Sequence, residues 1–300
     1  MIDLHSHTYE SDGTCSPAEL IEEARRAGVR TLGITDHDTF AGYDQAVPLA
    51  RQAGIELVCG IELSTKLYGS RSVHLLGYFL DGGPSREFRE WILDMQAARR
   101  DRNVRLTARL RELGFAITLE EVQAKGRGMT ARPHFAQVML EKGYVSTLQQ
   151  AFDDYLDESA IGYVQRREPT FAEGVQWIHA AGGITSLAHP IRIPGDLPAL
   201  MPELCAAGLD AIEVYHSDHG SEHAALYLDL ARRHGLGITG GSDFHGAAKP
   251  GILLGTGRNG NLRIPYELFE NLRALRRSAA LPLPAQRPSA ATSEAATYSS

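Results

Sequence analysis

Residues 2–8 read Ile-Asp-Leu-His-Ser-His-Thr, and residues 31–38 read Thr-Leu-Gly-Ile-Thr-Asp-His-Asp. Each stretch begins as a short apolar run of strand length and ends in histidine with serine, threonine or aspartate beside it. Between them, Ser16-Pro17-Ala18-Glu19 predicts a helix start with a capping box, and Gly28 predicts the end of that helix. A strand, a helix and a second strand in this order indicate a parallel pair joined by a right-handed crossover.

Six further runs are rich in valine, isoleucine, leucine and threonine and have strand length. The predicted strands are Ile55–Cys59, His74–Leu80, Gly183–Ala188, Ala211–Tyr215, Leu236–Thr239 and Ile252–Gly255. The predicted helices include one that ends at Gly54 and three near Phe171–Ala181, Glu222–His234 and Tyr266–Leu275. About eight strands that alternate with helices in 300 residues predict an α/β fold, with room for a barrel and an insertion.

The pattern changes between residues 81 and 168, where apolar side chains from Phe88 to Leu113 follow helical spacing. We expect residues 81–168 to form an inserted helical subdomain that caps the substrate, between barrel segments 1–80 and 169–280. The row from Arg99 to Arg111 is interpreted mainly as a solvated helix face. Residues 281–300 are rich in proline, alanine, serine and threonine and predict a flexible tail.

Composition excludes several classes of protein. The chain is 43% hydrophobic and 22% charged, which is typical of a globular protein and not of a disordered or fibrous one. No run of about 18 apolar residues predicts a membrane span, and no secretory signal is visible, so we expect a cytoplasmic location. Three cysteines without a C-x-x-C pair predict neither a disulfide framework nor a cysteine zinc site. Because the formal net charge is −7, a phosphate ligand would need a local positive site.

Histidines and acidic residues collect at the predicted strand ends, nearly all at or just past the carboxyl end. In a parallel barrel these ends meet at one rim, where barrel enzymes place their active sites. Such a cluster needs partners or metal ions, because unpaired buried ionisable groups are costly. Any one motif could be a set of ordinary polar rim residues, but the joint placement favours a metal site. The nine candidate ligands are His5, His7, Asp12, His37, Glu62, His74, His189, Asp243 and His245.

The ligand types narrow the choice of metal. Imidazoles and carboxylates without thiolates suit Mn²⁺, Fe²⁺ or Zn²⁺ better than Ca²⁺ or Mg²⁺. Nine ligands exceed the needs of one tetrahedral zinc ion, so two or three ions are expected. Of the remaining histidines, His219 is expected to face solvent, while His134, after Arg132-Pro133, and His216, at a strand end, stay open.

The motifs together resemble the PHP (polymerase and histidinol phosphatase) family over residues 1–80 and 170–260. The resemblance lies in residues 3–17 and 34–38, in Gly60-Ile61-Glu62, in Ala188-His189-Pro190 and in residues 241–245, Gly-Ser-Asp-Phe-His. It implies a distorted seven-stranded (β/α) barrel that holds two or three metal ions, often Mn²⁺, and hydrolyses phosphoesters. Zn²⁺, Fe²⁺ and Mg²⁺ are the alternative ions. Since eight strands are predicted, one strand could be peripheral.

The resemblance also implies how the ligands are shared. His5, His7, Glu62 and Asp243 would hold one ion, and Glu62 would bridge to a second ion bound by His74 and His189. Asp12, His37 and His245 would hold the third. Of these residues, Asp12, His37, Glu62 and His245 are expected to take part in catalysis, in which a metal-bound hydroxide attacks phosphorus.

Within the family, the helical insertion with Arg132-Pro133-His134 resembles the 3′,5′-nucleoside bisphosphate phosphatase type, which acts on molecules such as adenosine 3′,5′-bisphosphate. A second phosphate needs its own anchor, and an arginine fork matches phosphate oxygens. Arg132 and Arg192 are the expected anchors, and His134 could bind phosphate or donate the proton to the leaving group. Ser72 completes the set of candidate substrate contacts.

Three alternative functions stay open. One is a histidinol-phosphate-type phosphatase, and another is a 5′-3′ exonuclease on short RNA. The third is a regulatory or metal-storing barrel without activity. The expected partner is a small phosphorylated molecule, with a nucleotide as the first choice and short RNA as the second, and the sequence suggests neither a membrane nor an obligate protein partner.

Overall fold

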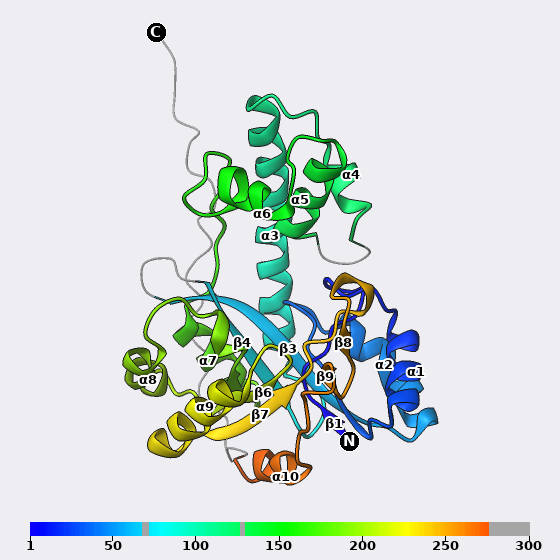
Figure 1. The fold of residues 1–300 in the computed structure, drawn as a ribbon, viewed down its shortest axis with the longest axis vertical. Helices are drawn as coiled ribbons and strands as arrows, with labels where there is room; N and C mark the ends of the chain where they lie inside the picture. Colours follow the sequence, from blue (N-terminus) through cyan, green and yellow to red (C-terminus); the bar gives the residue numbers. More distant parts are fainter. Residues whose placement is uncertain (68–71, 127–129, 276–300) are drawn as a thin grey trace.

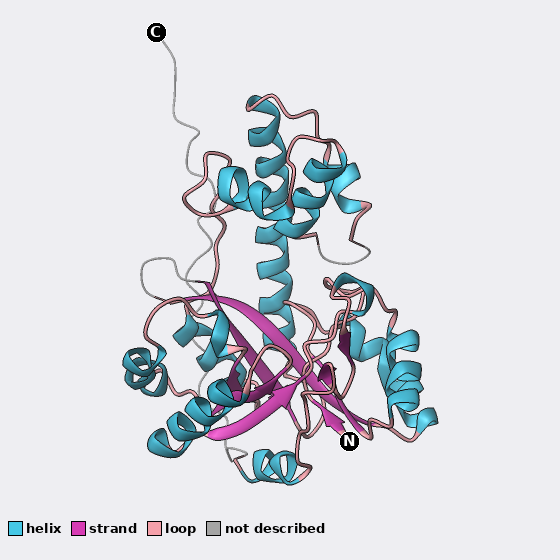
Figure 2. Cartoon of the chain, in the orientation of Figure 1, coloured by secondary structure: helices cyan, strands magenta, loops and turns pink. Residues whose placement is uncertain are grey.

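A seven-stranded sheet forms the centre of the molecule, with its strands in sequence order from β1 to β7 (Figure 1). The computed structural model describes residues 1–67, 72–126 and 130–275, so the predicted tail at 281–300 lies outside the described residues. The strands are β1 (Ile2–Asp3), β2 (Thr31–Ile34), β3 (Glu56–Lys66), β4 (Ser72–Phe79), β5 (Ile184–Leu187), β6 (Ala211–His216) and β7 (Gly237–Gly241). The curled sheet and its surrounding helices confirm the predicted distorted barrel (Figure 2).

The sheet closes where the chain after β1 meets the end of β7. The Leu4 N–H donates to the carbonyl of Gly240 at 3.2 Å, and the Asp243 N–H donates to the carbonyl of His5 at 2.9 Å. Gly241 permits this approach, because a Cβ there would lie 2.2 Å from the Cβ of His5. Barrel closure therefore places the residues that follow β1 beside the residues that follow β7 at one rim.

The direction of β4 differs from the predicted parallel arrangement. β4 pairs antiparallel with both β3 and β5, whereas the other neighbouring strands are parallel. Only residues 67–71 separate β3 from β4, and a parallel connection needs a crossover of a dozen residues or more. The prediction of an all-parallel sheet was therefore wrong at this strand.

The eighth predicted strand is peripheral. Two short strands, β8 (Ile252–Leu253) and β9 (Gly257–Arg258), pair with each other and not with the barrel sheet. The barrel itself thus has the seven strands that the family resemblance implied.

Six helices surround the barrel, with α1 and α2 on one side and α7, α8 and α9 on the other (Figure 1). They are α1 (Pro17–Ala27), α2 (Ala41–Ala53), α7 (Phe171–Ala180), α8 (Leu197–Ala206), α9 (Ser221–His234) and α10 (Glu267–Ala274). The predicted start of α1 is confirmed: Ser16 Oγ accepts from the Glu19 N–H, and Glu19 Oε2 accepts from the Ser16 N–H. Gly28, with φ of 73°, ends the helix in the left-handed conformation. Within the described ranges, no helix is both long and apolar enough to cross a membrane.

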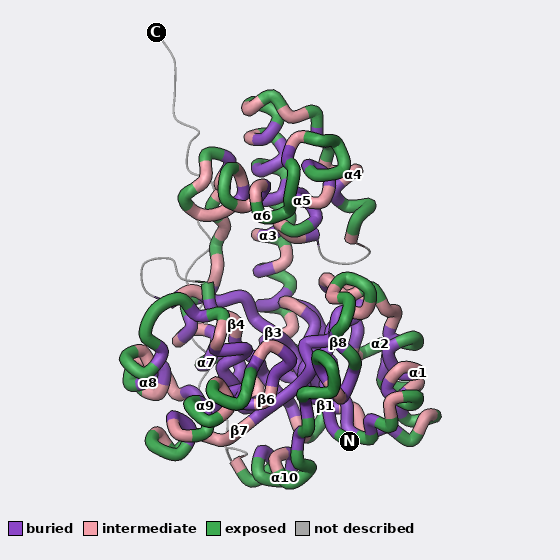
Figure 3. The backbone as a smooth tube through the Cα atoms, viewed as in Figure 1, coloured by how far each residue is buried: buried purple, intermediate pink, exposed green. Residues whose placement is uncertain are grey.

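The long helix α3 (Arg86–Glu112) rises from the barrel and carries the smaller helices of the insert (Figure 1; Figure 3). Its first half packs Phe88 and Trp91 into the barrel core, and its second half packs Leu106 and Leu110 into a separate core within the insert. The other elements of the insert are α4 (Leu119–Gln123), α5 (Arg132–Glu141), α6 (Leu148–Ala151) and a π-helical turn (Phe152–Leu156).

The middle of α3 corrects the interpretation of the arginine row. Arg99 and Arg102 are buried, at 8% and 4% exposure, although a solvated face was expected there. They continue the buried face of α3 between Met95 and Leu106, where the barrel and the insert meet. Arg100, Arg105 and Arg111 are exposed, as predicted.

Candidate active site

The carboxyl ends of the parallel strands supply most of the polar cluster. His5 and His7 follow β1, and His37 follows β2. Asp243 and His245 follow β7, and His189 follows β5. These strands point the same way, so their ends meet at one rim of the barrel.

The two remaining strands contribute from unexpected positions. Glu62 lies inside β3 rather than after it, because β3 runs past the rim to pair with β4. His74 lies near the amino end of β4, and the antiparallel direction of this strand brings that end to the same rim. The reversal of β4 thus explains how a residue that begins a strand can join residues that end strands.

His5, His7, Glu62 and Asp243 form one group whose possible ligand atoms all lie within 4.8 Å of one another. Glu62 Oε2 lies 3.2 Å from His5 Nε2 and 3.1 Å from His7 Nε2. Asp243 Oδ1 lies 3.5 Å and 3.4 Å from the same two nitrogens. All four side chains are buried. This is the group that the family resemblance assigned to the first ion.

The other carboxylate oxygen of Glu62 faces a second group. Glu62 Oε1 lies 2.8 Å from His74 Nδ1 and 2.7 Å from His189 Nε2. His37 Nε2 lies 3.5 Å from Glu62 Oε2. The two carboxylate oxygens of Glu62 thus face different sets of histidine nitrogens.

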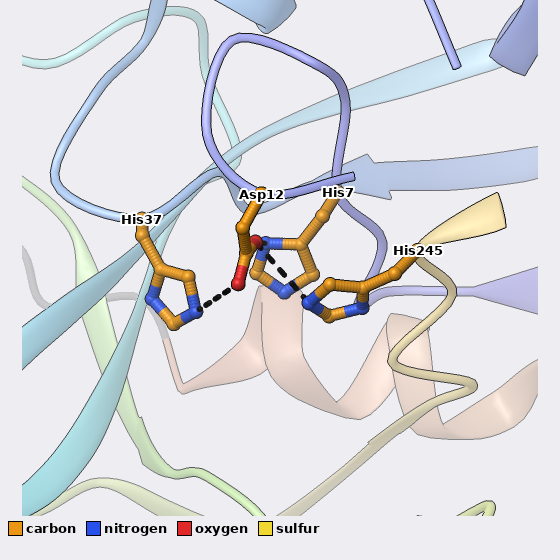
Figure 4. A group of neighbouring side chains, drawn as sticks. All are labelled: His7, Asp12, His37 and His245. Atoms are coloured by element: carbon orange, nitrogen blue, oxygen red, sulfur yellow. Dashed lines mark ion pairs between the residues drawn. The ribbon is translucent and has the colours of Figure 1, made fainter. Parts of the chain in front are cut away.

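Asp12 is the centre of a third group, drawn in Figure 4 with His7, His37 and His245. Its Oδ1 lies 3.2 Å from His245 Nε2 and 3.6 Å from His7 Nδ1, and its Oδ2 lies 3.6 Å from His37 Nε2. His7 belongs to this group and to the first one, so the groups form one continuous cluster. The structure therefore brings together all nine predicted ligands.

The donor atoms fit divalent metal ions. His7 Nε2 is buried and has no hydrogen-bond partner among the described residues, although two carboxylate oxygens lie within 3.4 Å of it. Burial lowers the pKa of His189 to about 3 and that of His37 to about 4, which leaves both imidazoles neutral and able to coordinate. Burial alone would raise the pKa of Glu62, but His37, His74 and His5 hold it well below its ordinary value. An unpartnered buried nitrogen beside ionised carboxylates is what a metal site requires.

Outer residues hold the candidate ligands in place. Glu213 lies 2.9 Å from His5 Nδ1 through Oε1, and its Oε2 accepts the backbone N–H of His189 at 2.7 Å. His245 Nδ1 lies 2.8 Å from the Asp243 carbonyl, so its Nε2 points toward Asp12. Such contacts fix the ring orientation of metal-binding histidines.

Asp243 is held from its other side. Its Oδ2 accepts from Arg192 Nη2 at 3.0 Å and from Lys249 Nζ at 2.6 Å, and it lies 3.4 Å from His216 Nε2. These contacts leave Oδ1 directed at the first group. The sequence left the placement of His216 open, and the structure buries it beside a candidate ligand.

His219 is also buried, and its Nδ1 donates to the Val214 carbonyl at 2.8 Å, so its predicted solvent exposure was wrong.

The backbone is strained at three points of this rim. Asp38, His189 and Asp243 have φ values of 51°, 24° and 55°, in a region that side-chain-bearing residues rarely adopt. Asp38 is held there by several contacts, among them the Ser64 N–H to its Oδ1 at 2.9 Å. Strain of this kind persists where the surrounding structure over-determines the conformation, and it concentrates at active sites.

A cavity of about 220 Å³ opens between the cluster and the insert. Asp12, His37 and His74 of the cluster line it together with four arginines, and Phe152 and Tyr163 supply aromatic surface. The four are Arg99, Arg102, Arg132 and Arg166. The lining thus combines residues of the His/Asp/Glu cluster with cationic groups that suit an anion.

The predicted substrate residues fall into two sets. Arg132 and Ser72 line the cavity. His134 is not among the lining residues, and its Nδ1 accepts the Ala131 N–H at 2.9 Å at the start of α5. Arg192 is also outside that lining, and it donates to Asp218 at 2.8 Å as well as to Asp243.

Sequence reasoning missed Arg99, Arg102 and Arg166 as cavity residues. A signal was present for the first two, because Met95, Arg99, Arg102 and Leu106 are spaced three or four residues apart, as along one helix face. Arginines that interrupt an otherwise apolar stripe face the same interior as their apolar neighbours. No comparable pattern surrounds Arg166, which lies between helices.

Comparison with known proteins gives consistent matches. A family model described as PHP domain matches residues 3–161. A 5′-3′ exoribonuclease of Haemophilus influenzae is 33% identical over 246 residues, which cover 81% of this chain and 89% of that protein. A 3′,5′-nucleoside bisphosphate phosphatase of Chromobacterium violaceum is 31% identical over 255 residues, covering 83% and 89%. A crystal structure from Bifidobacterium adolescentis, described as that of a metal-dependent phosphoesterase, aligns with a TM-score of 0.75 at 32% identity, over 92% of this chain and 96% of that one.

Proposed function

Because the chain belongs to the PHP domain family of metal-dependent phosphoesterases, we propose that it hydrolyses a phosphomonoester of a nucleoside 3′,5′-bisphosphate. The observation that carries this proposal is the cavity between the His/Asp/Glu cluster and the four arginines. A substrate with two phosphates can place one at the cluster and the other at the arginines. The inactive metal-storing alternative is set aside, because the relatives that share most of this chain are hydrolases.

We assign the nine predicted residues to two or three divalent ions, with Mn²⁺ first and Zn²⁺, Fe²⁺ and Mg²⁺ as alternatives. Nitrogen and oxygen donors without thiolates suit Mn²⁺, Fe²⁺ and Zn²⁺ alike, and the family resemblance places Mn²⁺ first. When bound, such ions polarise phosphoryl oxygens and lower the pKa of a water near phosphorus. Two or three of them outweigh the charge of the three carboxylate ligands, so the site attracts phosphate although the whole chain carries −7.

The chain's own residues orient the substrate. The arginines of the cavity bind the phosphate that is not cleaved, and Phe152 and Tyr163, which also line the cavity, contact the nucleoside. The insert supplies Arg99, Arg102, Arg132 and Arg166, and in this way it acts as the substrate cap. Asp12, His37, Glu62 and His245 face the reacting phosphate.

The contacts of His134 and Arg192 suggest positioning roles. His134 accepts the Ala131 N–H next to Arg132, so it fixes the start of α5 from which Arg132 reaches the cavity. Arg192 orients Asp243 by donating a hydrogen bond to the Asp243 Oδ2 atom. Neither residue needs to touch substrate to influence the rate.

A second candidate function is a 5′-3′ exonuclease on short RNA. The Haemophilus influenzae relative carries that name, and a second cavity of about 750 Å³ shares Tyr163, Arg166 and Glu168 with the first. A longer chain of nucleotides could extend from one cavity into the other.

One panel of substrates separates these functions. The metal-loaded protein would be assayed with adenosine 3′,5′-bisphosphate, histidinol phosphate and a 5′-phosphorylated short RNA labelled at its 3′ end. We expect the highest kcat/KM for phosphate release from the bisphosphate. Release of mononucleotides from the RNA at a higher kcat/KM would favour the exonuclease, and preference for histidinol phosphate would exclude both nucleotide functions.

A further inference from the structure

Arg102 differs from the other arginines of the cavity. It is 4% exposed, and its Nε, like that of Arg99, has no hydrogen-bond partner among the described residues. Within residues 1–67, 72–126 and 130–275, no carboxylate lies within ion-pair distance of its guanidinium. A buried cation without a counter-ion is costly unless a ligand supplies the opposite charge.

The other three arginines have partners. Arg99 is paired with Asp38 and donates to Ser64 Oγ at 3.1 Å. Arg166 lies 2.8 Å from Glu168 Oε1.

Arg132 Nη1 donates to the Leu156 carbonyl at 3.2 Å. Arg102 has no such contact among the described residues, and it lines the cavity. Burial and repulsion from Arg99, Arg166 and Arg132 lower the pKa of Arg102 to about 9, so it is still a cation at neutral pH.

The charges of the four cavity arginines and their neighbours do not cancel. Four guanidinium groups meet two carboxylates, those of buried Asp38 and partly buried Glu168, which leaves two positive charges. Lys66 adds one positive charge, but it is paired with Glu158, so the balance is unchanged. A phosphate monoester carries about −1.5 to −2 at pH 7, whereas an internal phosphodiester carries a single negative charge.

We propose that Arg102 is the anchor for a terminal, dianionic phosphate monoester, and that this arginine cluster selects such a group over the phosphodiester of a longer nucleotide chain. The proposal rests on the proposed function, since the anchored group is the phosphate of the substrate that is not cleaved. The site thus recognises the dianionic charge state through Arg102. Arg102 takes the place of Arg192 as an anchor, and Arg132 has an accessory role.

The first test compares a substrate that carries a terminal phosphate monoester with one that carries a methyl diester at the same position. Release of the 3′-phosphate would be measured for adenosine 3′,5′-bisphosphate and for its analogue with a methyl ester on the 5′-phosphate. In the metal-loaded full chain, kcat/KM should be higher for the bisphosphate. In Arg102→Gln the ratio of the two kcat/KM values should fall about tenfold or more, because hydrogen bonds to charged groups are strong.

Two variants control this result. Arg102→Lys keeps the charge without the fork, and its ratio should lie between those of the wild type and Arg102→Gln. Arg100→Gln changes an exposed arginine on the same helix and should leave the ratio unchanged. A ratio in Arg102→Gln within about twofold of the wild type, which is a negligible free-energy change, would overturn the proposal.

The second test needs no substrate turnover. Removal of a buried unpaired cation should stabilise the protein, so Arg102→Met should raise Tm by at least about 2 °C without phosphate. Inorganic phosphate, against chloride at equal ionic strength, should then stabilise the wild type more than this variant. A lower Tm in Arg102→Met together with equal stabilisation by phosphate would show a structural role and contradict the anchor. If the wild type released no phosphate from any substrate, the proposed function would fail, and this second test would still decide on the anion site.

Discussion

The Oε1 atom of Glu213 lies 2.9 Å from the Nδ1 atom of His5, and both side chains are fully buried. The contact leaves His5 Nε2 directed at Glu62 and Asp243. Glu213 thus sets the orientation of a candidate metal ligand from outside the cluster.

We expect Glu213→Gln to weaken metal binding by about 10- to 100-fold, because the imidazole loses the carboxylate that orients it and makes it more basic. Isothermal titration of metal-stripped protein with Mn²⁺ would measure this. Glu222→Gln, which changes an exposed glutamate, serves as the control. Equal Mn²⁺ affinity in Glu213→Gln and the wild type would show that Glu213 does not support the site.

Asp38 couples the barrel to the insert through Arg99. Asp38→Asn should lower the free energy of unfolding by about 3 kcal/mol, because it leaves Arg99 buried without its counter-ion. Urea unfolding would measure the change. In a double-mutant cycle with Arg99→Gln, the loss in the double variant should be smaller than the sum of the single losses. Additive losses would mean that the two residues act independently.

Gly241 is expected to tolerate no side chain. In Gly241→Ala the new Cβ would lie 2.3 Å from the backbone nitrogen of His5, so barrel closure and the first metal group should both be disrupted. Gly28→Ala is a matched comparison, since that glycine has open space and only its φ of 73° opposes alanine, at a cost of about 1 kcal/mol. Circular dichroism and Mn²⁺ titration would compare the two. Normal metal binding by Gly241→Ala would contradict this account of barrel closure.

Asp210 stabilises the far end of the barrel, away from the rim. Its Oδ2 lies 2.6 Å from His179 Nε2 and accepts the Thr185 N–H at 2.9 Å. Burial opposes ionisation, but these contacts lower the pKa of Asp210 below its ordinary value. Its stabilisation is therefore present above the unfolded-state pKa of about 3.9 and is lost as pH falls through the lower folded-state pKa.

Asp210→Asn should consequently cost about 1–3 kcal/mol of unfolding free energy at pH 7, and the difference from the wild type should shrink below about pH 4. Urea unfolding at pH 7, 5 and 3.5 would follow it, with Asp101→Asn at an exposed site as control. kcat/KM should stay at the wild-type value. A difference that grows as the pH falls would reverse the assigned sign.

Much of the site could be predicted because its signals are local. His5 and His7 are two residues apart at a strand end, and Asp243 and His245 repeat that spacing. Such pairs point to one face of a strand, and the parallel arrangement then places them at one rim. The capping box at Ser16 and the glycine at 28 were equally local, and both were confirmed.

The direction of β4 could not be read from its residues. Alternation and β-propensity show that a segment such as His74–Leu80 is a strand, but they are the same for parallel and antiparallel neighbours. Only the short length of the connection between β3 and β4 indicates that the two strands are antiparallel. The continuation of β3 through Glu62 depends on the same pairing.

The position of the arginines in the cavity depends on the tertiary structure. Arg99 and Arg102 lie in a segment whose arginine-rich composition is typical of a solvent-exposed helix. They are buried because the insert folds over that part of α3. Helical spacing with Met95 and Leu106 indicated their side of the helix, but not that polar groups would meet there. Glu213 lies in no recognised motif, and Asp38 lies in the 34–38 motif without a sign of its pairing with Arg99.

The central claim is that the cluster around Glu62 binds divalent ions that are required for phosphate release from a nucleoside bisphosphate. Its most direct measurement combines metal analysis with phosphate release from adenosine 3′,5′-bisphosphate, before and after chelation and after titration with Mn²⁺. The account predicts that the stripped protein is inactive and that activity returns as two or three ions bind per chain. Undiminished activity in the stripped protein, or no phosphate release at full occupancy, would contradict it.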